Sequence, residues 1–101
     1  IFQNHHFNLK GNNDILSLTN PEIVKSIHLS YLESGADIIE TNSFCSNSIS
    51  QTHYGLDSYI YSLNIKSAEI ALSSVDEYFK NFIDFCIQFE KDYVLEDIFK
   101  K

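Results

Sequence analysis

The sequence contains no tryptophan, no methionine and no arginine, and it has one proline and three glycines in 101 residues. Because methionine is missing even at position 1, we expect a piece of a longer protein. Seven lysines stand against fourteen carboxylates, and the formal net charge of −7 has the wrong sign for binding a phosphate backbone or an anionic lipid surface. We therefore expect neither nucleic acid nor a membrane as a partner.

The sequence also lacks a long apolar run and the cysteine spacing of a disulfide framework. No run approaches the roughly 18–20 residues that cross a bilayer, and no basic segment followed by an apolar one opens the chain. Cys45 and Cys86 lie 41 positions apart without a C-x-x-C pair, which favours two reduced thiols. With 44% hydrophobic and 14% aromatic residues, we expect one small, folded, cytoplasmic domain.

A helix is predicted over residues 20–34. Thr19 provides an N-cap, Pro21 suits the first turn, and Glu22 completes a capping box. Gly35 then supplies the residue that ends a helix in the left-handed conformation. Steps of three and four residues place several apolar side chains on a single face that we expect to be buried: Ile23, Ile27 and Tyr31, with Val24 and Leu32 beside them.

The remaining predicted elements are a strand and further helices. Residues 37–41 include β-branched side chains and lie between a helix stop and a polar cluster, which predicts a strand. Apolar residues at helical spacing predict a long helix over 58–90, with a candidate break near Asn81 or Asp84, and a shorter helix over 93–100. A helix followed directly by a strand and another helix is an α/β pattern.

Three stretches of the sequence form a recognisable set: L-K-G-N-N-D at 9–14, L-T-x-P-E at 18–22, and G-A-D-I-I-E-T-N-S-F at 35–44. Together they resemble the homocysteine-binding domain of cobalamin-dependent methionine synthases, with weaker similarity to about residue 78. The G-A-D-I-I-x-T-N string is shared with other homocysteine S-methyltransferases, whereas the first stretch and E-T-N-S-F point to the cobalamin-dependent branch. The chain is thus similar to an N-terminal fragment of that domain.

The resemblance implies a (β/α)8 barrel in which a zinc-bound homocysteine thiolate accepts a methyl group from methylcobalamin. A free thiol titrates near ~8.5, and coordination to a metal deprotonates it outright. Because a complete barrel needs about 250 residues, we expect a helix-rich partial barrel with about one parallel-type strand, at 37–41. We divide the chain into a homocysteine-binding domain over 1–79 and a divergent helical tail over 80–101.

The zinc-binding segments of the family, G-x-N-C and G-G-C-C-G-T, do not occur in this sequence. We therefore expect the chain alone to bind neither zinc nor cobalamin and to be inactive, and whether it acts as an enzyme stays open. His28, Cys45, His53 and Cys86 have zinc-binding side chains, but their successive spacings of 17, 8 and 33 fit no compact site. We assign no metal ligand, and we interpret His28 as a helix histidine at the edge of the buried face with a backbone or solvent partner.

The predicted substrate-binding residues follow the strand. Thr41, Asn42 and Phe44 match the family at the carboxyl end of the second barrel strand, where such enzymes gather substrate contacts, and the resemblance implies that they bind homocysteine. The alternative is that Asn42 and Ser43 only hydrogen-bond the turn that leaves the strand. Glu40 has no visible partner, so we assign no catalytic residue.

The aromatic residues near the C-terminus leave a second function open. At helical spacing they form a stripe that either packs an internal core, the commoner case, or docks a partner helix: Tyr78, Phe79, Phe82, Phe85, Phe89 and Tyr93. Expected partners are homocysteine in the intact family enzyme, and a protein that completes the barrel or binds this tail. The alternatives are a small acidic helical interaction module and a gene remnant without function.

Overall fold

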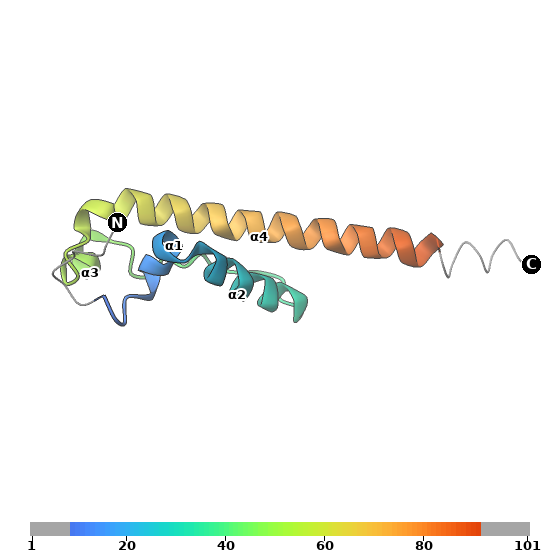
Figure 1. Ribbon diagram of the computed structural model, residues 1–101, viewed down its shortest axis with the longest axis horizontal. Helices are drawn as coiled ribbons and strands as arrows, with labels where there is room; N and C mark the ends of the chain where they lie inside the picture. The colour runs from blue at the N-terminus through green and yellow to red at the C-terminus, as the bar shows by residue number, and fades with distance from the viewer. Residues whose placement is uncertain (1–8, 92–101) are drawn as a thin grey trace, which may run out of the picture.

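The computed structural model describes residues 9–91, which form helices joined by turns and loops without a β-strand in that range. In chain order the elements, with η marking a 3-10 helix, are η1 (Asn13–Ile15), α1 (Leu16–Thr19), α2 (Pro21–Glu33), α3 (Ser48–Thr52), η2 (Asp57–Tyr59) and α4 (Ile60–Phe89). The long helix α4 is the axis of the molecule, and α1 and α2 lie along one side of its N-terminal part (Figure 1). None of the helices within 9–91 combines the length and the apolar character needed to cross a bilayer.

The helix α2 confirms the prediction over 20–34 to within one residue at each end. Pro21 occupies the first helical turn as predicted, where its missing N–H leaves no bond unmade. Thr19 is not the N-cap, because Asn20 takes that position and the Thr19 hydroxyl donates to the Ile15 carbonyl oxygen at 3.2 Å. The predicted capping box is therefore wrong, since Thr19 belongs to the end of α1.

The C-terminal end of α2 depends on Gly35. Its φ of +100° lies in the left-handed region, which favours glycine. The Gly35 N–H donates to the Leu32 carbonyl at 3.1 Å and the Ala36 N–H to the Tyr31 carbonyl at 3.0 Å, which is the bond pair of a Schellman motif. The chain then reverses and runs back towards α3 (Figure 1).

The buried face of α2 differs from the predicted one. Val24, His28 and Leu32 are buried where α2 packs against α4. The three residues at the centre of the predicted face are exposed instead: Ile23, Ile27 and Tyr31. Burial is confirmed for Val24 and Leu32, which were placed beside that face. The centre of the face was mispredicted because spacing identifies apolar stripes on a helix but does not decide which of two adjacent stripes meets the neighbouring helix.

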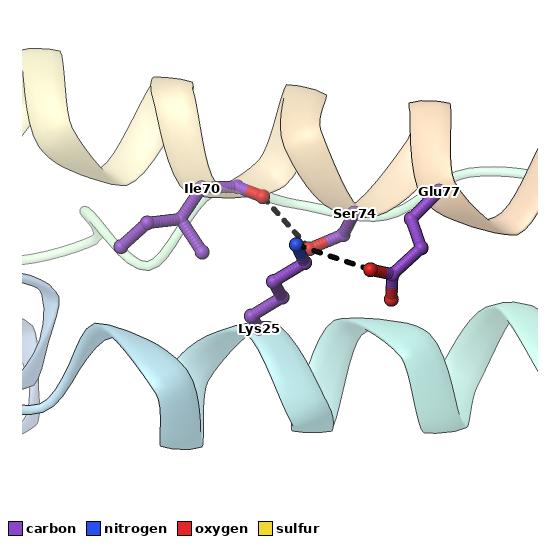
Figure 2. Close-up of polar contacts among 4 residues, drawn as sticks. All are labelled: Lys25, Ile70, Ser74 and Glu77. Atoms are coloured by element: carbon purple, nitrogen blue, oxygen red, sulfur yellow. Dashed lines mark hydrogen bonds and ion pairs between the residues drawn. The ribbon is translucent and has the colours of Figure 1, made fainter.

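Small buried side chains of α4 face α2, and an ion pair spans the two helices at the surface (Figure 2). Ser67 and Ser74 are almost fully buried, and the Ser74 hydroxyl donates to the Ile70 carbonyl at 2.7 Å, so its polar group is satisfied within α4. Lys25 Nζ lies 3.3 Å from Glu77 Oε1, and both side chains are partly exposed. Such a pair contributes little, so the side chains buried between the helices contribute more to their contact than this ion pair does.

The hydrophobic core lies at the N-terminal end of α4. Ile15, Leu56 and Leu63 are buried together, and partly buried residues from the neighbouring segments pack around them: Leu9, Leu18, Tyr54 and Tyr59. The cluster joins η1, the turn before η2 and the start of α4. It therefore holds residues 9–15 against the part of the chain that follows α3.

Residues 37–41 form no strand in this structure. A β-strand needs backbone hydrogen bonds from a neighbouring strand, and the described residues supply none. The segment lies instead as an irregular connection in which Ile38 is 85% exposed and Ile39 is partly buried. The partial barrel therefore stays a prediction, while the described residues form a helical assembly.

The long helix predicted over 58–90 is confirmed, with η2 preceding α4 directly. The candidate break near Asn81 or Asp84 does not occur, because the helix runs unbroken through both residues. The domain boundary predicted between residues 79 and 80 falls inside this helix and stays a prediction. The expectation that the aromatic residues near the C-terminus pack in an internal core is wrong. The helix α4 continues past the end of α2, and its last phenylalanines are exposed: Phe79, Phe82, Phe85 and Phe89. Tyr93 and the helix predicted over 93–100 lie outside the described residues.

Truncating the core should destabilise the whole chain. Leu63 is fully buried in the cluster with Ile15 and Leu56, so we expect Leu63→Ala to lower the free energy of unfolding by about 2–5 kcal/mol. Leu72→Ala, at an exposed position of the same helix, is the matched control and should stay within about 0.5 kcal/mol of the wild type. Urea unfolding followed by circular dichroism measures both, and equal losses would contradict this core.

Candidate functional site

Asp14, in the first stretch that carries the family resemblance, bonds the residues that directly follow the stretch at 35–44. The 3-10 helix η1 places its side chain inward, where it is buried. Its Oδ2 accepts one hydrogen bond from the Cys45 backbone N–H at 2.9 Å and another from the Ser46 hydroxyl at 2.7 Å. A carboxylate that accepts two bonds in a buried position holds its donors firmly. The loop around 42–46 is thereby fixed onto residues 12–14.

A second buried pair, Asn12 and Gln51, reinforces this joint. The Asn12 amide donates to Gln51 Oε1 at 2.8 Å, and the Gln51 amide donates to Asn12 Oδ1 at 3.2 Å and to the Cys45 carbonyl at 3.0 Å. Neither residue was predicted to have a role. Asn12 was visible within the L-K-G-N-N-D stretch, whereas nothing in the sequence marks Gln51, which reaches this position only because α3 folds back.

Asn42 bonds a distant segment of the chain, and not the turn that was considered as the alternative to substrate binding. Its amide nitrogen donates to the Asn13 carbonyl at 2.9 Å and lies 3.4 Å from the Ser17 hydroxyl. Thr41 and Ser43 pair through their hydroxyl groups. These contacts shape the loop and leave the predicted homocysteine contacts untested.

A groove of about 730 Å³ lies between α2 and the segment that follows it. Ile27, Tyr31 and Ile38 contribute apolar wall, and Thr41 and Asn42 lie at the same groove. Two exposed apolar residues of α2, Ile27 and Tyr31, therefore line this hollow. It is large enough for a small amino acid, and cavities of this kind, mostly apolar with a few polar groups, are typical of ligand sites.

Phe44 lies apart from this groove. It is 94% exposed and borders a second hollow of about 510 Å³, together with Cys45, His53 and Asn42. Asn13 and Asn42 both border the two hollows. Of the predicted substrate-binding residues, the structure brings Thr41 and Asn42 to one cavity and separates Phe44 from it.

His28 is buried between α2 and α4, and its Nε2 has no hydrogen-bond partner among the described residues. The predicted backbone or solvent partner for that atom is therefore absent from the described structure. Burial lowers the pKa of His28 below its ordinary value of 6.5, because the charged imidazolium loses hydration there. The side chain is neutral at pH 7.

The described residues do not fit zinc. Within 9–91, no three side chains among histidine, cysteine, aspartate and glutamate come together as a metal site. Cys45 is partly buried in the loop and Cys86 is exposed on the far part of α4. No step of a reaction is therefore assigned through zinc here.

A family model for homocysteine S-methyltransferases matches residues 2–95 of the sequence. The chain belongs to this family. The match includes both stretches, 9–14 and 35–44, and it extends beyond residue 79. The buried polar joint of this homocysteine S-methyltransferase chain thus connects the first stretch to residues that directly follow the second.

Removing the Asp14 carboxylate should loosen the loop at 42–46. We expect Asp14→Ala to lower the free energy of unfolding by about 1–3 kcal/mol, because two donors lose their acceptor, and to speed hydrogen exchange of the Cys45 amide. Asp76→Ala, an exposed carboxylate on α4, is the control for lost charge. Unchanged Cys45 exchange in Asp14→Ala would show that this carboxylate does not hold the loop.

The buried His28 should make stability depend on pH. Since its pKa is lowered on folding, the unfolded chain takes up the proton first as pH falls below about 6.5, so the free energy of unfolding falls with pH there. We expect His28→Leu to flatten this part of the pH dependence, and His53→Leu, at an exposed histidine, to leave it unchanged. Denaturant unfolding between pH 5 and pH 8 measures the slopes, and parallel slopes for wild type and His28→Leu would refute the assignment.

Proposed function

We propose that the chain supplies part of the homocysteine-binding domain of a cobalamin-dependent methyltransferase, in which the homocysteine sulfur accepts the methyl group of methylcobalamin. The observation that supports this is the joint at Asp14, which fixes the loop after residues 37–41 and leaves Thr41 and Asn42 at the groove. We propose that residues 37–41 form a strand only within a complete (β/α)8 barrel, where a neighbouring strand supplies backbone hydrogen bonds. Thr41 and Asn42 would then lie at the carboxyl end of that strand, where such barrels carry substrate contacts.

The groove offers homocysteine only some of the contacts that it needs. Glu40 and the Thr41 hydroxyl provide acceptors for the substrate ammonium group, and Ile27 and Ile38 provide an apolar wall for its methylene groups. No lysine lies among the residues that line this groove, so the substrate carboxylate must be bound by groups outside it. A free thiol is also mostly protonated at neutral pH.

These gaps lead us to propose that the chain by itself is inactive and binds neither zinc nor cobalamin. The missing contacts would come from the other parts of a complete barrel, in the same protein or in a partner chain. The alternative is a small acidic helical interaction module, which is favoured by one observation, the exposed phenylalanines at the end of α4.

A graft tests the proposed function directly. Residues 9–91 replace the corresponding stretch of an active cobalamin-dependent homocysteine methyltransferase, and in parallel that of a cobalamin-independent family member. We expect methionine formation from the first hybrid, because the graft supplies matching groove residues, and little or none from the second. Methionine is measured by mass spectrometry, with the isolated chain as the inactive reference. Failure of both hybrids, each shown to be folded by circular dichroism, would contradict the proposal.

Within the active hybrid, Thr41→Val should raise the KM for homocysteine roughly tenfold, because it removes one hydrogen-bonding group from the groove. Thr52→Val is the matched control, since Thr52 is exposed on α3 and lines neither hollow. Equal KM values for the two variants would remove Thr41 from the site.

A further inference from the structure

The helix α4 carries one ladder of residues three or four positions apart along its whole length. The first half of the ladder is buried beneath the neighbouring helices and contains Leu63, Ser67, Ile70, Ala71 and Ser74. The second half continues on the same face as Tyr78, Phe82, Phe85 and Phe89, which we call the aromatic seam. Figure 1 shows α4 extending well past the end of α2. The face that packs against the chain in its first half therefore has exposed rings in its second half, at Phe82, Phe85 and Phe89.

The aromatic seam has the spacing of a coiled-coil interface. Its residues follow in steps of four, three and four, as the a and d positions of a heptad do. All charged residues between 75 and 91 fall on the outer b, c and f positions: Asp76, Glu77, Lys80, Asp84, Glu90 and Lys91. The positions beside the seam are uncharged and contain Phe79, Asn81, Cys86 and Gln88. Charge is thus absent from the whole half-face that a partner helix would touch.

The rings of the seam are ordered in pairs and expose a substantial area. Tyr78 stacks on Phe82 and Phe85 on Phe89, each with ring centroids 6.3 Å apart. Phe82, Phe85 and Phe89 are 51%, 66% and 48% exposed. Phe79, which lies beside the seam, is 59% exposed. At roughly 200 Å² per phenylalanine, the exposed parts of these four side chains amount to about 450 Å² per chain. Two such faces would bury about 900 Å², close to the ~1,000 Å² of the smaller specific interfaces.

We propose that the occupant of the aromatic seam is the same seam of a second copy of this chain, paired antiparallel. A second copy presents the required uncharged face at the required spacing. Parallel pairing is excluded by shape, because α2 already covers this face of α4 over its first half. In an antiparallel pair, residues 78–89 of the two copies face each other beyond the buried part of α4, and the pair has the two-fold symmetry of most homodimers.

The antiparallel arrangement is self-complementary residue by residue. It sets Phe82 against Phe85 of the second copy and Tyr78 against Phe89, so aromatic rings meet at every level of the seam. Beside the seam, Asn81 comes next to Gln88 of the second copy, an amide pair. At this area we expect a reversible dimer with a dissociation constant of roughly tens of micromolar.

Sedimentation equilibrium of the full chain at about 150 mM salt tests the proposal. We expect Phe85→Glu, which puts a charge in the seam, to weaken association roughly 30-fold or more, as loss of a central aromatic contact does. Ile87→Glu adds the same charge at an outer position of similar exposure and should change the dissociation constant less than about threefold. Circular dichroism confirms that both variants keep the helix.

Charge pairs beside the seam test the orientation. In the antiparallel dimer the double variant Asn81→Lys/Gln88→Glu creates two attractive pairs, and we expect it to tighten association roughly threefold. The matched variant Asn81→Lys/Gln88→Lys creates two repulsive pairs and should weaken it by a similar factor. Both shifts should shrink at 1 M salt.

Three results would overturn the proposal. The first is a chain that stays monomeric at several hundred micromolar. The second is an assembly that Phe85→Glu leaves intact, which would place the contact elsewhere, for example on the exposed face of α2. The third is equal weakening by Phe85→Glu and Ile87→Glu. These results are independent of whether the methyltransferase graft is active.

Discussion

The buried carboxylate of Asp14 holds together the two parts of the chain on which its family membership rests. It accepts hydrogen bonds from Cys45 and Ser46 and so fixes the loop at 42–46 against η1. The amide groups of Asn12 and Gln51 hydrogen-bond each other and so connect the residue before η1 to α3. The 37–41 segment has no neighbouring strand within residues 9–91. Its end is instead positioned at the groove by this joint together with the bond from the Asn42 amide to the Asn13 carbonyl.

The helix α4 serves two different purposes along its length. Its first half packs small and apolar residues against α1 and α2 and supplies Leu63 to the core. Its second half presents aromatic rings with no charge on the seam or beside it. The groove and the aromatic seam thus lie on separate parts of the molecule, and a ligand in one does not compete with a partner at the other.

Local rules predicted the helices well. Pro21 and Gly35 mark the ends of α2 because proline suits a first turn and glycine adopts a positive φ, and both effects depend on neighbouring backbone alone. Thr19 was misplaced because two helices meet there and its hydroxyl bonds back into α1. The buried face of α2 and the exposure of the aromatic tail were also mispredicted, since both depend on where α4 lies.

The sequence by itself determined the family, the extents of α2 and α4, and the apolar ladder of α4. Motifs, helix-end residues and apolar spacing each depend only on residues that are close together in the sequence. Only the tertiary structure decided which groups meet. It brought Gln51 to Asn12 across 39 positions, separated Phe44 from Thr41, and left Ile38 exposed. Contacts between distant segments depend on how helices pack, and packing is a property of the assembled chain that no single stretch of sequence contains.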